Sequence, residues 1–347
     1  MSGHVTWTEL VSQPDAWARL LARLDAGTDV PAVSLHDYDE MLLLGSGTSY
    51  YLAMAAADWV ARRAAIDVRA VPSCEIVLDE HQRRLAAGRK RLVVAISRSG
   101  ESSELILAID ALRGDDTTIL GLSCVADSTL IGRADIPFFL AEGHEDGLVM
   151  LRSFTSMLIA LQYLFGSNAD REALRILPAA GQAVLERDTD MLRAVANLYP
   201  FDRFVFLASG ASYPIALEAG LKVQEMSIST SETYHSLEYR HGPKATADRN
   251  TLLTLFTLAD PALGLSLARD MKALGVTLLV VGPGAERYRE IADMVVPAPA
   301  GMDEGVASTI NLLPLQIAAF GTAMRKGKNP DAPENLSKVV ILEPAHG

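Results

Sequence analysis

The sequence predicts an α/β protein made of two tandem doubly wound parallel sheets, with helical extensions at both ends. Two observations predict this fold. Short apolar runs alternate with helical patterns, which is typical of parallel sheets covered by helices on both faces. A seven-residue segment also occurs twice, each time after an apolar run and before a helical pattern. The 347 residues are enough for two ordinary domains.

The first forty residues predict helices. Pro14 suits the first turn of a helix, where a missing N–H costs nothing. Trp17, Leu20, Leu21 and Leu24 follow at i, i+3, i+4 and i+7, so they form one apolar face.

Strand-length apolar runs begin after this segment. The first two end in loops rich in glycine and hydroxyl side chains, Gly45–Ser49 and Ser97–Ser102, and a helical pattern follows each loop. The predicted strands of this half are Met41–Leu44, Arg91–Ile96, Thr117–Leu122 and Ile136–Leu140.

An internal repeat sets the domain organisation. Leu44–Tyr50 reappears as Leu207–Tyr213, and Ala134–Pro137 closes the first copy as Ala292–Val295 closes the second. The stretch Thr257–Asp260 lacks the hydroxyl-and-glycine pattern of the first copy. We expect a helical segment at 1–40, a first domain at 41–145, a helical connector at 146–200, a second domain at 201–300, and a C-terminal helix and tail at 301–347.

The two serine-bearing loops predict an anion site. Ligands of open parallel sheets bind beyond the carboxyl ends of the strands, where helix N-termini offer N–H donors and partial positive charge. Ser49, Ser97, Ser99 and Ser102 would add hydroxyl donors. Helix capping is the alternative explanation of these residues. A dinucleotide site is a third one, although Tyr50 stands where G-x-G-x-x-G has its last glycine.

A second group of residues indicates acid–base chemistry. Glu218, Lys222 and Glu225 are spaced i, i+4 and i+7, so they share one helix face. A solvated ion-pair stripe is the alternative, but the helix is otherwise Ala, Leu and Val, as expected of a buried one. His241 precedes Gly-Pro at an abrupt turn, where loops often present functional side chains. The other histidines considered are interpreted as structural: His36, His144 and His235.

Composition excludes several classes of function. The net charge of −12 disfavours nucleic-acid and anionic membrane surfaces, which require clustered Lys and Arg. Two cysteines, Cys74 and Cys124, are too few for a disulfide framework and fit a reducing compartment. No secretory signal and no membrane-length apolar run is apparent, so we expect a cytoplasmic protein. The residue spacings predict neither a metal site nor a cofactor.

Taken together, these segments resemble the sugar isomerase (SIS) family, best known from the isomerase half of glucosamine-6-phosphate synthase. The resemblance runs from about Met41 to Val340, and it implies flavodoxin-like SIS domains. The opening TWTELVSQPDAW also resembles the tagatose-6-phosphate ketose/aldose isomerase branch, which is linked to amino-sugar-phosphate deamination. The motifs that carry the family resemblance are GSGTS (45–49), SRSGES (97–102), SFTSM (153–157), ASYPIALEAGLKVQE (211–225), ETYHSLEYRHGP (232–243), PLQ (314–316) and NPDAPENLSKVV (329–340).

The resemblance implies roles for individual residues. Glu225 matches the base that moves a proton between C1 and C2, supported by Glu218 and Lys222. His241 matches the histidine that opens the sugar ring, which in the family reaches the active site of the neighbouring subunit of a homodimer. Lys338 matches the lysine that contacts the open-chain carbonyl. The family's phosphate-binding positions correspond to Gly47, Thr48, Ser49, Ser97, Arg98, Ser99 and Ser102.

The resemblance predicts an enzyme that converts a hexosamine 6-phosphate to a ketohexose 6-phosphate and ammonia by aldose–ketose isomerisation. The alternatives are a plain phosphosugar isomerase and a non-catalytic phosphosugar sensor. Two positions depart from the synthase: Arg98 replaces Gln, and Met150 replaces a Ser that contacts the sugar. We also expect no glutamine-dependent amination, because this sequence has no amidotransferase domain and no N-terminal cysteine nucleophile.

Overall fold

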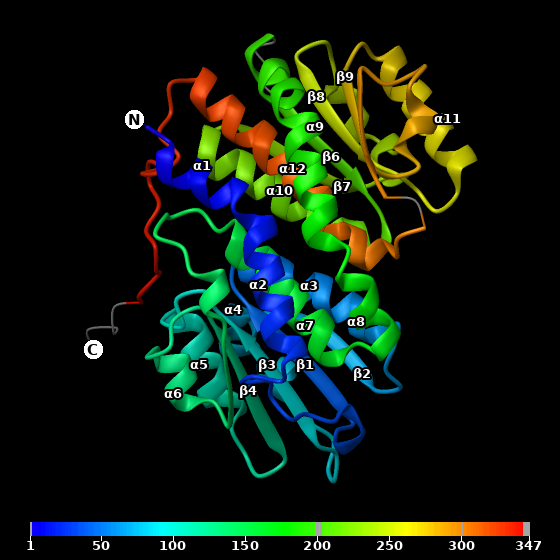
Figure 1. Ribbon diagram of the computed structural model, residues 1–347. Coiled ribbons are helices and arrows are strands. Elements are labelled where there is room, and N and C mark those ends of the chain that lie inside the picture. The colour runs from blue at the N-terminus through cyan, green and yellow to red at the C-terminus, as the bar shows by residue number, and fades with distance from the viewer. Residues whose placement is uncertain (1, 199–200, 202, 300, 343–347) are drawn as a thin grey trace. The chain divides into compact units, whose positions relative to one another are not determined.

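The computed structural model describes residues 2–198, 201, 203–299 and 301–342. Parts of four expected segments lie outside these residues: the first residue of the N-terminal segment (1), the end of the connector (199–200), two residues of the second domain (202 and 300) and the end of the tail (343–347). The chain forms two compact units (Figure 1). The first-sheet unit comprises Asp15–Asp146, Met150–Arg175 and the tail from Ser337, and the second-sheet unit comprises the chain up to Pro14, Gly147–Val149 and Ile176–Leu336.

The first-sheet unit contains a five-stranded parallel sheet in the order β2-β1-β3-β4-β5. Its strands are β1 (Glu40–Gly45), β2 (Asp67–Pro72), β3 (Arg91–Ile96), β4 (Thr117–Ser123) and β5 (Ile136–Phe139). Its helices are α2 (Gln13–Asp25, which begins in the other unit), α3 (Thr48–Ala61), α4 (Ser73–Leu78), α5 (Ser103–Leu112), α6 (Thr129–Arg133), α7 (Arg152–Phe165) and α8 (Asn168–Leu174).

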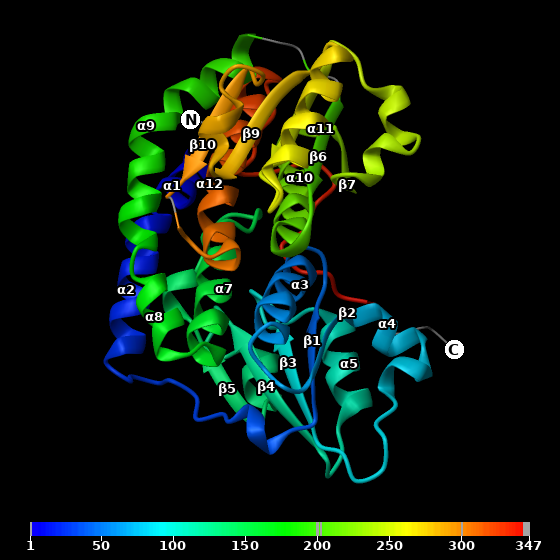
Figure 2. The same ribbon diagram turned by 90° about the vertical axis from the view of Figure 1, so that its right-hand side faces the viewer.

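Both faces of this sheet are covered. Leu42, Val93 and Ile119 pack with residues of α4, α5 and α6 in one apolar cluster. Alternate strand residues such as Leu43 and Val94 are equally buried, and they point to the opposite face because side chains alternate along a strand. Helix α3 packs on β1 and β2 and also contacts α7 (Figure 2). Burial on both faces explains why these strands read as continuous apolar runs.

The second-sheet unit repeats this topology. Its strands are β6 (Arg203–Ala208), β7 (Thr230–His235), β8 (Thr251–Phe256), β9 (Thr277–Pro283) and β10 (Met294–Ala298), all parallel, in the order β7-β6-β8-β9-β10. Its helices are α1 (His4–Val11), α9 (Leu177–Leu198), α10 (Tyr213–Ser227), α11 (Pro261–Ala273) and α12 (Glu304–Arg325).

The two sheets confirm the predicted duplication at the level of single side chains. Asp135 accepts a hydrogen bond from the amide of Ile119 at 2.8 Å, and Asp293 accepts one from Leu278 at 2.7 Å. In each copy the amide of the aspartate donates back to the same residue's carbonyl. The repeated Ala-Asp pair therefore fixes the last strand to the preceding strand in the same way in both halves.

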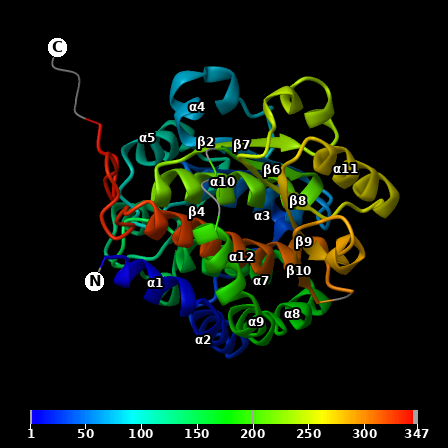
Figure 3. The same cartoon turned by 90° about the horizontal axis from the view of Figure 1, so that it is seen from above.

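Helix α12 forms much of the second-sheet unit's interior. It packs against α9 and α10, with α1 alongside (Figure 3). By length and composition α12 could cross a membrane, but 94% of its most apolar window is buried inside the protein, as in the core helix of a globular unit. The helix continues through Pro314.

The strand predictions for the first half are confirmed within one residue at each end, and the amphipathic helix around Trp17 is confirmed as α2. Trp17 and Leu20 are fully buried. Strand β2 was missed. It lies at the edge of the sheet and carries the polar residues Asp67 and Arg69, so it lacks the apolar run that marks its neighbours.

Candidate functional site

The predicted anion loops lie on neighbouring strands of the first sheet. Strand β1 pairs with β2 on one side and with β3 on the other, so the connections after β1 and β3 leave in opposite directions across the sheet. This is the switch point at which open parallel sheets bind ligands. The loop 45–49 follows β1 and the loop 97–102 follows β3.

Glycines shape the first loop. Gly47 has a φ of 55° and is the N-cap residue of α3, so the N-cap residue offers no capping side chain. A Cβ on Gly45 would lie 2.3 Å from the carbonyl of Ser49, so only glycine fits there. Thr48 and Ser49 are buried at the start of the helix. The loop thus brings the N-terminus of a 14-residue helix directly behind β1.

The second loop is built from serine hydroxyls. Ser97 Oγ accepts a hydrogen bond from the amide of Gly100 at 2.9 Å, and Ser99 Oγ accepts one from Glu101 at 3.2 Å. Gly100 has a φ of 70°, and a Cβ there would lie 2.2 Å from the hydroxyl of Ser128. Ser102 is the N-cap residue of α5, yet its side chain makes no capping hydrogen bond. Helix capping therefore does not account for Ser102.

The second copy has closed the corresponding position with its own carboxylate. Asp260 caps α11, and its Oδ1 accepts hydrogen bonds from the amides of Ala262 and Leu263 at 2.8 and 3.3 Å. A carboxylate that occupies a helix N-terminus satisfies the donors that a phosphate would use. The stretch Thr257–Asp260 therefore differs from the loop 97–102, where the N-cap residue Ser102 makes no side-chain capping hydrogen bond.

The predicted acid–base residues of α10 form an ion-pair cluster that is largely buried. Lys222 Nζ lies 3.3 Å from a carboxylate oxygen of Glu218 and also forms an ion pair with Glu225. Lys222 and Glu218 are fully buried, whereas the Glu225 side chain keeps 19% of its surface exposed. The solvated ion-pair stripe considered from spacing alone is therefore wrong for the first two residues. Only the Glu225 carboxylate remains accessible to a ligand.

The charge balance of this cluster keeps the lysine protonated. Burial alone lowers the pKa of Lys222, but the carboxylates of Glu218 and Glu225 outweigh burial, so the pKa lies above its usual value. Lys222 is therefore an ammonium ion at neutral pH. This ammonium ion forms an ion pair with the Glu225 carboxylate.

His241 lies outside this cluster, on an exposed loop. It follows the 3₁₀ turn Glu238–Arg240, and its amide donates to the carbonyl of Glu238 at 2.9 Å. Gly242 has a φ of 128°, a conformation that glycine adopts readily, and it turns the chain sharply after the histidine. The imidazole is thus presented to solvent by a defined turn.

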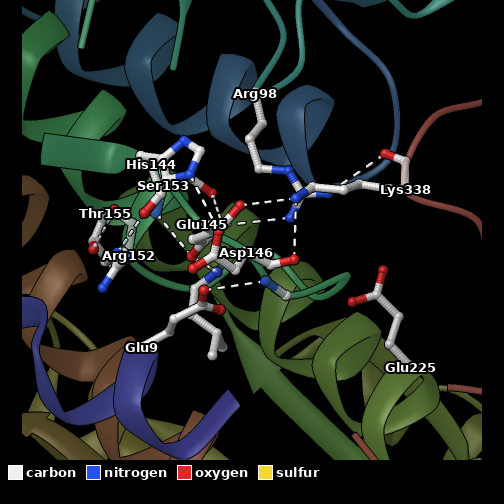
Figure 4. Close-up of polar contacts among 12 residues, drawn as sticks. Glu9, Arg98, His144, Glu145, Asp146, Arg152, Ser153, Thr155, Glu225 and Lys338 are labelled. Carbon is white, nitrogen blue, oxygen red and sulfur yellow. Dashed lines mark hydrogen bonds and ion pairs between the residues drawn. The ribbon is translucent and has the colours of Figure 1, made fainter. Parts of the chain in front are cut away.

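Two predicted residues, Arg98 and Lys338, both contact Glu145, a residue that the sequence did not single out (Figure 4). Arg98 lies 3.4 Å from the buried carboxylate of Glu145, and it donates to the carbonyl of Lys338 at 3.4 Å. The ammonium of Lys338 donates to the carbonyls of Glu145 and Asp146. In the sequence, His-Glu-Asp-Gly reads as an exposed acidic turn, so no local signal distinguishes Glu145.

Other parts of the described chain offer less. A cavity of about 720 Å³ lies at the amino ends of the first three strands, away from the serine loops. The arginines that line it already form ion pairs, Arg89 with Asp67 and Arg63 with Asp170. Within the described ranges no group of His, Cys, Asp and Glu side chains could hold a metal ion.

Comparison with known proteins shows the family of this chain. The two parallel sheets of the same topology, with glycine- and serine-rich loops at the switch point of the first, define a tandem α/β protein. The SIS domain model matches residues 34–167 and 197–324. The chain therefore belongs to the SIS domain family.

Individual relatives agree with this assignment. The glutamine–fructose-6-phosphate aminotransferase (isomerizing) of Pyrobaculum aerophilum is 28% identical over 98% of this chain, which spans 58% of that relative's length. Glucosamine-6-phosphate deaminase of Thermotoga maritima is 26% identical with a TM-score of 0.80, covering 97% of this chain and 99% of that one. Tagatose-6-phosphate ketose/aldose isomerase of Escherichia coli is 23% identical with a TM-score of 0.85, covering 99% and 98%, and shows the shared fold.

Proposed function

We propose that this protein is an isomerase and deaminase that converts a hexosamine 6-phosphate and water to a ketohexose 6-phosphate and ammonia. The observation that carries the proposal is that the two copies of the repeat carry different candidate site residues. The first keeps an anion loop with no carboxylate cap, and the second carries a buried, charged acid–base cluster. The deaminase relative, similar over nearly the whole length of both chains, supports the choice of an amino sugar.

In the proposed reaction, the two serine loops hold the phosphate, with donors from Gly47, Thr48, Ser49 and residues 97–102. His241 moves a proton from the C1 hydroxyl to the ring oxygen, which opens the ring. The Lys338 ammonium stabilises the charge that develops on the carbonyl oxygen at C1. Holding a substrate in this way turns proton transfer into an effectively intramolecular step.

Glu225 then removes the proton from C2 and delivers it to C1. Removal of the C2 proton gives an enolamine intermediate. Protonation of this intermediate at C1 gives a hydroxymethyl group at C1 and a ketimine at C2. Water adds to the ketimine, and ammonia departs to give the ketose. Lys222, which pairs with both Glu218 and Glu225, holds the base in place. Positioned proton transfer of this kind contributes about 10²–10⁴-fold to the rate.

The first test is ammonia release over a panel of hexosamine 6-phosphates, with ketose formation from hexose 6-phosphates measured in parallel. Turnover of an amino sugar with one ammonia per ketose supports the proposal. Ketose formation from hexose phosphates without ammonia from any amino sugar would identify a plain isomerase. Phosphosugar binding without any turnover would identify a sensor.

The second test assigns the base. Glu225→Gln should bind phosphosugar normally while its kcat falls about 10²-fold or more, because proton transfer at C2 has lost its acceptor. The control is Glu290→Gln, which removes an exposed carboxylate from the same unit. Retention of activity in Glu225→Gln would refute the assignment.

We further propose a homodimer in which His241 serves the partner subunit. Its exposed position on a loop is compatible with this arrangement. Mixing the separately inactive Glu225→Gln and His241→Asn variants should then restore about a quarter of the wild-type activity, because half of the dimers are hybrids with one intact site each. No recovery after subunit exchange would place both residues in one chain. The cytoplasmic location expected from the sequence stays a prediction.

A further inference from the structure

Glu145 is a buried carboxylate at the start of a helix. Its side chain is fully buried, and its two oxygens accept hydrogen bonds from the amides of Leu151 and Ser153 at 2.7 and 3.1 Å and from the Ser153 hydroxyl at 2.5 Å. Ser153 lies in the first turn of α7, so the carboxylate caps that helix from six to eight residues upstream. Capping donors and the helix dipole offset the cost of burying the charge.

The backbone next to Glu145 holds the C-terminal tail. Lys338 Nζ donates to the carbonyl of Glu145 at 2.9 Å and to that of Asp146 at 3.1 Å. The preceding carbonyl, that of His144, accepts a hydrogen bond from Arg152 at 2.6 Å. Three consecutive carbonyls are thus used, and the side chain of Glu145 fixes the backbone that presents them (Figure 4).

The same tail also contacts the helix that follows the second serine loop. The amide of Ser103, the first residue of α5, donates to the carbonyl of Val340 at 3.2 Å, and the amide of Leu342 donates to the Ser103 hydroxyl at 3.1 Å. Arg98, within the serine loop, contacts both Glu145 and the carbonyl of Lys338. The tail therefore has two attachments, one at 145–146 and one at the start of α5.

We propose that Glu145 is a positioning residue that couples the phosphate loop to the tail lysine. Its carboxylate orients the Arg98 guanidinium, and its backbone carbonyl, with that of Asp146, sets the position of the Lys338 ammonium. This inference rests on the proposed function for the roles of Arg98 and Lys338. The coupling itself is a property of contacts within the first-sheet unit and can be measured without turnover.

The chemistry of the pocket predicts what a neutral replacement does. The hydrogen-bond and ion-pair partners of the Glu145 carboxylate are donors: two amides, one hydroxyl and a guanidinium. A glutamine keeps the shape but offers one acceptor oxygen and places an NH₂ group among these donors. It also removes the negative charge that lies 3.4 Å from the guanidinium of Arg98, a side chain that is 7% exposed. Glu145→Gln should therefore loosen the serine loop and the tail together.

The test combines hydrogen exchange with binding on the full-length protein. In Glu145→Gln, amide exchange measured by mass spectrometry should accelerate about tenfold in peptides covering residues 337–342 and Ser103, and the Kd for inorganic phosphate should rise about tenfold, as expected for losing a charged hydrogen bond. With a substrate that the wild type turns over, Glu145→Gln should show both a higher KM and a lower kcat. A merely structural role would reduce the folded fraction and leave KM unchanged.

Matched variants make the result decisive. Glu142→Gln removes a carboxylate from the same segment, one that pairs with Arg23, and should leave tail exchange and phosphate binding as in the wild type. Glu145→Asp keeps the charge and should recover part of the lost affinity. If Glu145→Gln does not fold, Ser153→Ala removes a single donor from the same carboxylate and should give a smaller change in the same direction.

Wild-type tail exchange and an unchanged phosphate Kd in folded Glu145→Gln would overturn the inference. If the wild-type enzyme turns over none of the phosphosugars, the proposed function fails instead, and the exchange and phosphate measurements still decide whether Glu145 couples the loop to the tail.

Discussion

Replacing Lys222 by methionine tests the energetics of the buried cluster most directly. Methionine keeps the length and apolar stem of the side chain and removes the charge. Glu218 would then remain fully buried without the ammonium that lies 3.3 Å from it. At an effective dielectric constant of about 20, that attraction amounts to about 5 kcal/mol. Breaking a buried pair by removing one partner costs about 3–5 kcal/mol in practice.

The expected loss is a large fraction of the free energy of unfolding of a typical protein, about 5–15 kcal/mol. Urea unfolding followed by circular dichroism should therefore show a marked fall in the midpoint for Lys222→Met. The double variant Glu218→Gln, Lys222→Met should be more stable than the single variant, because it leaves no uncompensated charge in the interior. Glu225 is partly exposed, so water can solvate it in both variants.

The contribution of Lys222 to the free energy of unfolding depends on pH in one defined direction. The folded-state pKa of Lys222 lies above the ordinary value of 10.5, so the pair's contribution is fully present below pH 10.5 and is lost as the pH rises through the folded-state pKa. The stability gap between wild type and Lys222→Met should be constant from pH 7 to 9 and narrow only in stronger alkali. A single variant within about 1 kcal/mol of the wild type, or a double variant no more stable than the single one, would refute the argument.

Three further predictions concern the loops and the N-terminal helix. Gly100→Ala should destabilise the protein by about 1–3 kcal/mol and weaken phosphate binding, because a Cβ would lie 2.2 Å from the Ser128 hydroxyl and the backbone is left-handed there. Thermal melting measures the stability and phosphate titration the affinity. A normal phosphate affinity would contradict the role of this loop. Asp260→Ala should cost about 1 kcal/mol in urea unfolding through loss of the α11 cap, with Asp260→Asn close to wild type; equal losses in both variants would show that the cap is not the cause. Burial raises the pKa of Asp331, but hydrogen bonds from the amide and hydroxyl of Thr6 outweigh burial and hold the pKa below its usual 3.8. The stability that this carboxylate contributes is therefore present above pH 3.8 and lost as the pH falls through the folded-state pKa. The free energy of unfolding, measured from about pH 5 downwards, should depend less on pH in Asp331→Asn than in the wild type, and an identical pH dependence would contradict this account.

Much of the fold could be predicted because its strands are buried on both faces. Such strands appear as uninterrupted apolar runs, and a parallel sheet needs a helix between successive strands. The edge strand β2 escaped detection because partial exposure admits polar residues and removes the run. The duplication was readable because the same turn chemistry, glycine followed by hydroxyl residues, recurs at the same point of each copy.

The sequence showed the spacing of the charged residues on α10, but it did not decide whether they are buried or exposed to solvent. The i, i+4, i+7 pattern places Glu218, Lys222 and Glu225 on one face of a helix in any protein. Whether that face is solvated or buried depends on what packs against α10, and the packing of α12, β6 and β7 decides it.

The sequence alone determined the parallel sheets, their repetition, the glycine- and serine-rich turns and the order of the charged residues on α10, since each of these depends on neighbours along the chain. Only the tertiary structure decided that Lys222 and Glu218 are sealed from water while Glu225 is partly exposed. It also decided that Glu145 contacts both Arg98 and Lys338, a lysine 193 residues further along the chain. Burial and long-range contact depend on how distant segments pack, and local residue patterns carry no record of that packing.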